Sequence, residues 1–292
     1  MSAEDPSVVI NWADEAAHIG AALASDSAWY AATAEALVSP SDRLAIDVGC
    51  GGAGMAIALT RALPTEASVV GVDGDDDILD AAQSNITEAG LGDGRIRLVK
   101  ADLERDLSTL ADAAAEADII WASGSVHHLA DQQGAIDALA GLLASGGRLA
   151  LAEGGLPSRH LPWDLGIGQP GLEIRLHSAE DRWFARMRES LPGHVRMPYG
   201  WPVALRRAGL VDVTTHTSTF AKPAPLDDTN LSSLLTQLAH RVKRVTDSGE
   251  LGEDDIQVWA RILDQDDSAW LGARDDLYSL SARSVYVGHR PA

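Results

Sequence analysis

The segment from residue 44 to residue 59 constrains the fold of this chain more than any other part of the sequence. An apolar run ends in Asp47, four glycines follow (Gly49, Gly51, Gly52 and Gly54), and an Ala/Ile/Leu pattern closes the segment. This order predicts a buried parallel strand, a tight glycine turn and a helix whose first N–H groups point at a ligand. Because the carboxylate of Asp47 would repel a phosphate, the segment favours a ligand that carries a positive charge.

Strands and helices alternate through the rest of the first half. Strands are predicted at residues 43–48, 68–73, 95–102, 118–123 and 148–153, and helices at 53–63, through 78–86 and around 135–143. Alternation at this spacing indicates βαβ units and a parallel sheet, which binds ligands beyond the carboxyl ends of its strands. Polar residues recur at all five predicted strand ends: Asp47, Asp73, Asp102, Ser123 and Glu153.

The remainder of the chain is less regular. Residues 8–38 read as helical, and the proline-rich stretch 154–198 predicts a continuous helix only at about 179–191. Further on, the pattern predicts a helix at 201–208, strands at 210–219 and 284–289, and two or three amphipathic helices within 228–280. The apolar stripe of residues 231–245 would pack on the core or on a second copy in a homodimer.

The run Asp47-Val-Gly-Cys-Gly51 resembles motif I of the class I S-adenosylmethionine-dependent methyltransferases that act on small molecules. Where that motif usually has a further glycine, this chain has Ala53. The resemblance implies an α/β, Rossmann-like, seven-stranded and mostly parallel sheet with helices on both faces, plus a helical lid. It divides the chain into an N-terminal helical cover (1–40), a cofactor-binding core (41–154), a lid insertion (155–198), a core continuation (199–221), a helical lid insertion (222–282) and a final core strand (283–292).

The same resemblance assigns cofactor-binding roles to residues at the strand ends. Asp47, Gly49, Cys50 and Gly51 would cradle the methionine end of S-adenosylmethionine; Asp73 and Gly74 would contact the ribose, Asp102 and Leu103 the adenine, and Ser123 the methionine or methyl group. Two alternatives stay open, because Asp73 would also serve as a helix N-cap and Asp102 as a solvated turn residue.

Candidate catalytic and substrate-binding residues lie further along the chain. His128 and Glu153 are the candidate proton acceptors, since histidine titrates near working pH and a carboxylate at this edge would meet the substrate. The alternatives are that His128 packs at the start of the next helix and that Glu153 caps a loop. His127, Trp163 and Tyr199 are candidate substrate contacts. No metal site is predicted, because adjacent histidines point apart.

The predicted reaction is methyl transfer to an oxygen or nitrogen of a small organic molecule, driven mainly by proximity and in-line alignment and yielding S-adenosylhomocysteine. Three other functions remain open. Gly49 to Gly54 also spells the dinucleotide fingerprint, with Asp73 about 20 residues on, which would suit an NAD(P)-dependent oxidoreductase. A non-catalytic protein that binds S-adenosylmethionine is the second alternative. The third is an enzyme that transfers another group of the cofactor, as aminopropyl transferases do.

Charge and composition exclude several partners. The formal net charge of −20 would repel nucleic acid and anionic membranes. Cys50 is the only cysteine, so an internal disulfide is excluded. Without a signal-peptide pattern or an apolar run of membrane-spanning length, the sequence is expected to be that of a cytoplasmic protein.

Overall fold

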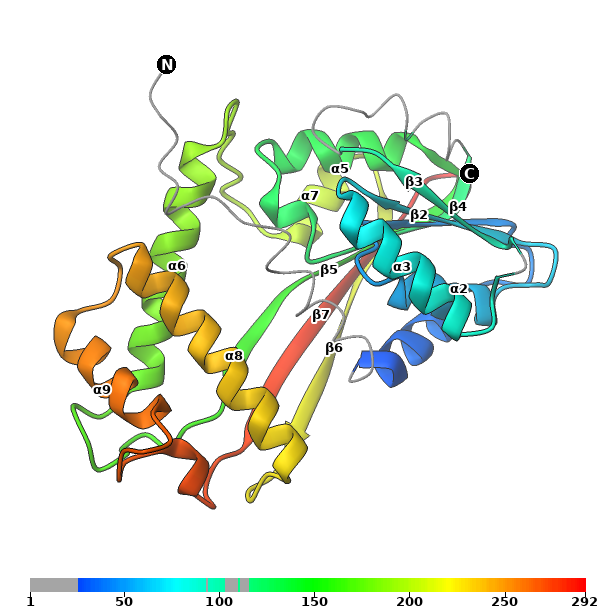
Figure 1. The fold of residues 1–292 in the computed structure, drawn as a ribbon. Helices are drawn as coiled ribbons and strands as arrows, with labels where there is room; N and C mark the ends of the chain where they lie inside the picture. The colour runs from blue at the N-terminus through cyan, green and yellow to red at the C-terminus, as the bar shows by residue number, and fades with distance from the viewer. Residues whose placement is uncertain (1–25, 93, 103–109, 111–115) are drawn as a thin grey trace. The chain divides into compact units, whose positions relative to one another are not determined.

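A computed structural model describes residues 26–92, 94–102, 110 and 116–292, and its contacts divide the chain into two compact units. The sheet unit contains the described residues up to 153 together with 193–216 and 284–292 (Figure 1). The helical unit contains residues 154–192 and 217–283. Each unit is described by itself below.

Within the described residues, seven strands form one sheet in the order β3-β2-β1-β4-β5-β7-β6. The strands are β1 (Leu44–Val48), β2 (Ser68–Asp73), β3 (Ile96–Lys100), β4 (Ala117–Ser123), β5 (Leu143–Arg159), β6 (Val211–Lys222) and β7 (Ser279–His289). The five strands from β1 to β5 pair in parallel. The chain order reverses between β1 and β4, which is the place where open α/β sheets bind ligands. The predicted mostly parallel, seven-stranded sheet is confirmed.

The strand β7 enters the sheet between β5 and β6 and runs against β5. Gly146 donates its N–H to the carbonyl of Arg290, and Arg290 donates its own N–H to Gly147, so the end of β7 meets the beginning of β5. A Cβ on Gly147 would lie 2.7 Å from the carbonyl oxygen of Ala117. Only glycine therefore allows the chain to enter β5 at this distance.

Helices cover both faces of the sheet. In the sheet unit they are residues 26–37, α2 (Gly54–Ala62), α3 (Asp76–Glu88), the short 3-10 helix η2 (Val126–His128), α5 (Gln132–Gly141) and α7 (Trp201–Arg207). Figure 1 shows α2 and α3 on one face and α5 and α7 on the other. Asp75 and Asp131 cap α3 and α5 by accepting N–H groups of the first turn, which is why these helices begin where they do.

The core of the sheet unit forms because the central strands are buried on both faces. Ile46, Ile120 and Leu151 are fully buried and pack with the apolar sides of α5 and α7. Continuous burial of this kind is typical of parallel strands covered by helices on both sides. The result is a rigid platform that holds the polar residues at the strand ends.

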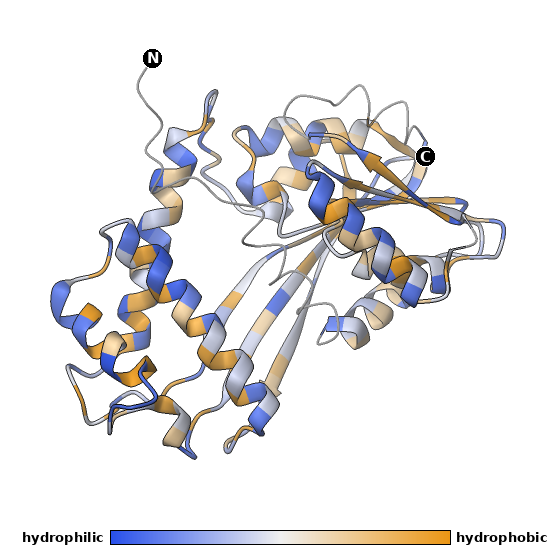
Figure 2. Ribbon diagram, in the orientation of Figure 1, coloured by the Kyte–Doolittle hydropathy of each residue, from blue (hydrophilic) through white to orange (hydrophobic). Residues whose placement is uncertain are grey.

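The helical unit is built around α6 (Leu172–Ser190), α8 (Asp228–Asp247), α9 (Glu253–Leu263) and the short 3-10 helix η3 (Leu271–Ala273). Apolar and polar residues alternate along α8, as Figure 2 shows, and its buried side chains are Leu234, Leu238, Val242 and Val245. This periodicity means that α8 covers apolar surface with one face. The predicted apolar stripe is thus used within this chain.

Several predicted element boundaries were wrong. The strand expected at 148–153 is β5, which spans Leu143–Arg159, and the last strand begins at Ser279 instead of residue 284. The helix expected from about 179 begins at Leu172, because Gly171 takes a left-handed conformation and allows the chain to turn into it. The predictions for residues 8–25 lie outside the described residues.

No helix among the described residues is long and apolar enough to cross a membrane. The predicted lid role of residues 155–198 and 222–282 stays a prediction.

Candidate functional site

The glycine loop after β1 contacts the loop after β4. Gly49 has a φ of +65°, and a Cβ at this position would lie 2.7 Å from the Cβ of Ser125. The side-chain hydroxyl of Ser125 in turn donates to the carbonyl of Val48 at 3.3 Å. Glycine is required here for both conformation and space, and the contact links the predicted cofactor loop to the residues that follow β4.

Asp47 lies buried at the end of β1, only 2% exposed. One of its carboxylate oxygens accepts the N–H of Ala56, in the first turn of α2, at 2.9 Å. Burial raises the pKa of Asp47 to about 7; the hydrogen bond from Ala56 opposes this rise, and the negative charge of Asp73 adds to it. A positive charge placed beside this buried acid would lower its pKa and favour the ionised carboxylate.

Asp73 ends β2 and is half-buried. Its carboxylate accepts the N–H of Gly51 at 3.1 Å and that of Asp75 at 3.4 Å. Burial raises its pKa, and the backbone hydrogen bonds partly offset that effect. The N-cap of α3 is Asp75, whose side chain accepts N–H groups of the first turn, so Asp73 is not needed for that role.

Cys50 contributes its backbone to the loop and its side chain to the core. Its N–H donates to the carbonyl of Val72 at 2.9 Å. The thiol packs beside Gly71, where a Cβ would lie 3.3 Å from the sulfur. Burial raises the pKa of Cys50 well above its ordinary value, so the residue behaves as a small apolar side chain.

Ala53, at the N-cap of α2, has a φ of +63°. This left-handed conformation is one that glycine adopts more readily than alanine, which agrees with the glycine usually found here in the resembled motif. Alanine has no side-chain acceptor, so the first turn of α2 begins without a side-chain cap.

The remaining predicted cofactor residues lie along the same edge of the sheet. Gly74 follows Asp73 and lies beside Asp102, since a Cβ on Gly74 would be 3.9 Å from the Cα of Asp102. Asp102 is half-buried, as is Ser123 at the end of β4. Leu103 lies outside the described residues. The structure thus brings the ends of β1, β2 and β3 together, and the roles of these residues stay predictions.

Glu153 organises the loop after β4. It is 1% exposed, and one carboxylate oxygen accepts the N–H groups of Ser125 at 3.2 Å and Val126 at 2.9 Å. Its other oxygen lies 2.6 Å from Nδ1 of His127. The sequence predicted Glu153 at a strand end, which was wrong, because β5 continues to Arg159. The pairing of Glu153 with His127 was not predicted, because no local pattern shows which of two adjacent histidines faces a carboxylate far along the chain.

His128, the predicted base, lies against His127, with the ring centroids 4.0 Å apart and the ring planes inclined by 44°. The short helix η2 ends at His128, and the carbonyl of His127 accepts a hydrogen bond from Gln132 at 3.0 Å. Glu153 therefore contacts the first histidine of the pair, and the second lies beside it.

Two predicted substrate residues belong to different units. Trp163, in the helical unit, is 66% exposed and lies against Gly171. Tyr199, in the sheet unit, donates its hydroxyl to Gln133 at 3.0 Å, and the guanidinium of Arg207 lies 4.1 Å from its ring centre. These contacts explain how each aromatic ring is held, and their substrate-binding roles stay predictions.

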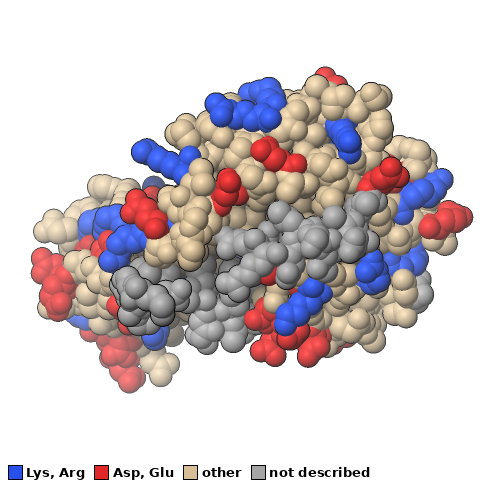
Figure 3. Space-filling model, turned by 90° about the horizontal axis from the view of Figure 1, so that it is seen from above, with Lys and Arg blue, Asp and Glu red and all other residues tan. Residues whose placement is uncertain are grey.

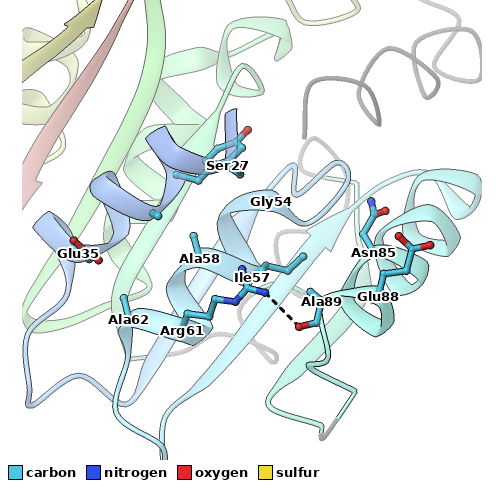
Figure 4. A pocket seen from close by; sticks show the side chains of 12 residues that line it. Ser27, Glu35, Gly54, Ile57, Ala58, Arg61, Ala62, Asn85, Glu88 and Ala89 are labelled. Atoms are coloured by element: carbon cyan, nitrogen blue, oxygen red, sulfur yellow. Dashed lines mark hydrogen bonds between the residues drawn. The ribbon is translucent and has the colours of Figure 1, made fainter. Parts of the chain in front are cut away.

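A cavity of about 460 Å³ lies in the sheet unit beside the residue 26–37 helix, α2 and α3. Figure 4 shows its floor of Ile57, Ala58 and Ala62, with Arg61 donating to the carbonyl of Ala89. None of the strand-end acids lines this cavity, so it is separate from the candidate site.

Basic and acidic side chains are interspersed on the face of the molecule drawn in Figure 3. Among the described residues, no group of three or more histidine, cysteine, aspartate or glutamate side chains is arranged to hold a metal ion. The described groups at this edge of the sheet include carboxylates, backbone N–H groups and an imidazole.

Residues 46–151 match a family model described as a methyltransferase domain. Over 137 residues the chain is 32% identical to an uncharacterized methyltransferase of Mycobacterium tuberculosis, and a protein of the same description from Mycobacterium bovis matches equally. This match covers 47% of the chain and 64% of the relative, so the chain spans less than two thirds of that protein's length.

Two solved structures share the fold. The YcgJ protein of Bacillus subtilis aligns with a TM-score of 0.51 at 17% identity, covering 90% of this chain and 98% of that one. An O-methyltransferase family protein of Burkholderia thailandensis aligns with a TM-score of 0.51 at 14% identity, covering 94% of this chain and 59% of that one. At these identities the likeness establishes the fold alone.

Proposed function

We propose that this chain, of which residues 46–151 match a methyltransferase domain, is a class I S-adenosylmethionine-dependent methyltransferase and transfers the methyl group of S-adenosylmethionine to an oxygen or nitrogen of a small organic molecule. The products are the methylated acceptor and S-adenosylhomocysteine. A small acceptor is favoured because a net charge of −20 opposes approach of nucleic acid.

One observation carries the proposal: two carboxylates with raised pKa values share one edge of the sheet. Burial raises the pKa of both Asp47 and Asp73, and the charge of Asp73 raises that of Asp47 further. A ligand that carries an ammonium and a sulfonium would relieve this repulsion, whereas a pyrophosphate would add to it. The pair therefore supports S-adenosylmethionine over a nicotinamide dinucleotide.

The residues at this edge fit the parts of the cofactor. The half-buried carboxylate of Asp73 offers two acceptors for the ribose hydroxyls, while Asp102 would meet the adenine. The first turn of α2 has no side-chain cap from Ala53, and its N–H groups other than that of Ala56, which donates to buried Asp47, would face a carboxylate of the cofactor. When bound, S-adenosylmethionine supplies an electrophilic methyl group on a sulfonium leaving group.

The main task left to the protein is alignment of the acceptor with the methyl carbon and the sulfur. Holding reactants in this geometry lowers a barrier by roughly 7–11 kcal/mol in favourable cases. Loop residues held by hydrogen bonds suit this task because they do not need to reorganise during the reaction; one example is Gly51, whose N–H donates to the carboxylate of Asp73 at 3.1 Å.

Calorimetric titration with S-adenosylhomocysteine, NADH and NADPH tests the proposal. We expect S-adenosylhomocysteine to bind and neither NADH nor NADPH to bind. Asp73→Asn is expected to weaken binding about 10-fold to 100-fold, because hydrogen bonds to a charged group contribute about 1.5–3 kcal/mol. Asp76→Asn is the matched control, since its carboxylate is exposed and pairs with Lys100.

Binding of a dinucleotide in place of S-adenosylhomocysteine would contradict the proposal, as would unchanged affinity in Asp73→Asn. Transfer of a labelled methyl group from S-adenosylmethionine to a panel of small hydroxyl and amine compounds then separates an enzyme from a protein that only binds the cofactor.

A further inference from the structure

The contact between Glu153 and His127 goes beyond what cofactor binding requires. Glu153 lies inside β5 and is 1% exposed, and its two oxygens meet three donors of the loop after β4. One oxygen accepts from the backbone of Ser125 and Val126, at 3.2 and 2.9 Å. The other oxygen lies 2.6 Å from Nδ1 of His127, which is the distance of a strong hydrogen bond.

This arrangement selects one tautomer of the imidazole. Because a carboxylate oxygen only accepts, the nitrogen facing it must carry the hydrogen, and Nδ1 of His127 is therefore the donor. In the neutral ring, Nε2 then keeps its lone pair and is able to take a proton. The same logic gives a carboxylate the task of fixing the histidine tautomer in serine hydrolases.

The paired imidazole is held next to the predicted cofactor loop and is partly exposed. The side chain of His127 is 30% exposed, whereas that of Glu153 is fully buried. Gln132 fixes the backbone of His127 by donating to its carbonyl at 3.0 Å. Ser125, two residues earlier, touches the position where Gly49 would carry a Cβ. The loop after β4 thus joins a fixed imidazole to the glycine turn.

We propose that His127 is the general base of the methyl transfer, that Glu153 is the residue that positions it, and that the acceptor atom is a hydroxyl oxygen. This inference rests on the function proposed above and narrows it to O-methylation. A hydroxyl holds its proton at neutral pH and needs a base, whereas an uncharged amine attacks through its free pair.

The step balances as follows in atoms and electrons. The hydroxyl proton passes to Nε2 of His127 while an oxygen lone pair forms the new bond to the methyl carbon. The bond between that carbon and sulfur breaks, and its electron pair stays on sulfur as a neutral thioether. Glu153 stabilises the imidazolium that results, and the proton then leaves to water.

Glu153→Gln tests the positioning role with little change in shape. The amide oxygen still accepts from Ser125 and Val126, but the amide nitrogen now donates to Nδ1 and forces the ring hydrogen onto Nε2. We expect unchanged affinity for S-adenosylhomocysteine and a methyl transfer rate to hydroxyl compounds lower by about 100-fold to 10,000-fold. The methyl transfer rate of His127→Gln is expected to fall by the same factor. The rate of Asp76→Asn, whose original side chain is exposed on α3, is expected to stay unchanged.

Long-range nitrogen–proton NMR spectra of the histidine rings give a readout that a merely structural role would not move, and they need no acceptor. We expect hydrogen on Nδ1 of His127 in the unaltered protein and on Nε2 in Glu153→Gln. Hydrogen on Nε2 in the unaltered protein overturns the inference, and so does a His127→Gln variant that transfers methyl at the original rate.

The two proposals fail in different ways. A protein that binds S-adenosylhomocysteine but methylates only amines overturns the base assignment and leaves the proposed function standing. A protein that does not bind S-adenosylhomocysteine overturns the proposed function, and the base assignment falls with it.

Discussion

Each unit of the molecule contains a buried glutamate that accepts two consecutive backbone N–H groups near a histidine. In the sheet unit, Glu153 accepts from Ser125 and Val126 and also meets the ring of His127. In the helical unit, Glu173 accepts from the backbone of His160 with both oxygens, at 3.0 and 3.1 Å, and from that of Leu161 at 3.2 Å. The two sites share residue types and differ in what the carboxylate does for the imidazole.

The difference lies in access. The ring of His160 is directed to the carbonyl of Tyr278, at 3.3 Å from Nδ1, and the residue is 3% exposed. Burial lowers its pKa to about 4, and the positive charge of Arg241 lowers it further. The side chain of His160 is thus buried and uncharged, whereas that of His127 is hydrogen-bonded to Glu153 and 30% exposed. A buried Glu beside a His indicates chemistry only when the ring is partly exposed.

The largest change in stability is expected from Glu173→Ala. The variant leaves the N–H groups of His160 and Leu161 buried without their acceptor, and each such group costs about 1–3 kcal/mol, so we expect about 4 kcal/mol lower free energy of unfolding. Glu153→Ala is expected to cost less, because Ser125 is only half-buried and water replaces part of the loss. Urea unfolding of both variants checks this; equal losses would contradict the comparison.

A smaller loss of unfolding free energy is expected when the pH is lowered. His160 has a pKa of about 4 in the folded protein against an ordinary 6.5, so between these values the unfolded chain binds more protons. The contribution of the uncharged ring to the free energy of unfolding is therefore full above about pH 6.5 and is lost as the pH falls toward 4. About 2 kcal/mol of this free energy is lost between pH 7 and pH 5. The raised pKa of Glu173 acts in the opposite direction.

His160→Asn isolates the contribution of the histidine, because asparagine keeps a donor for the carbonyl of Tyr278 and does not titrate. We expect the difference in unfolding free energy between pH 7 and pH 5 to shrink in this variant, and to persist in the control His216→Asn, where the original side chain is exposed. An undiminished pH dependence in His160→Asn would show that the buried ring is not the cause.

The smallest effect is expected from Gln132→Ala. The variant removes one hydrogen bond, to the carbonyl of His127, and we expect it to lower the unfolding free energy by about 1 kcal/mol. Gln257→Ala on the exposed side of α9 is the control and should change stability by less than about 0.5 kcal/mol. Thermal unfolding measures both, and a loss in Gln132→Ala no larger than in the control would mean that the backbone of His127 is held by other contacts.

The strand ends could be predicted from the sequence because the rule for parallel sheets is local. A buried run followed by a polar residue identified Asp47 and Asp73, and the strand order then brought them to one edge. Glu153, which was expected at a strand end, lies inside β5. The same rule could not separate His127 from His128. That choice depends on the turn of η2 and on a carboxylate 26 residues further along the chain.

The helical unit was harder to predict for a related reason. The start of α6 at Leu172 depends on the left-handed conformation of Gly171, which packs against Trp163. The pairing of His160 with Glu173 closes a loop that no periodic pattern reveals. Such contacts are set by tertiary packing, which helix and strand propensities do not describe.

The lone thiol of Cys50 has a practical consequence. It is the only cysteine of the sequence, it is buried in the turn after β1, and burial raises its pKa, so a thiol reagent meets an unreactive group while that turn stays closed. Labelling then proceeds only through excursions that expose the turn, and its rate reports their free energy. The labelling rate of Cys50 therefore measures how often the glycine loop opens, and the measurement needs no engineered cysteine.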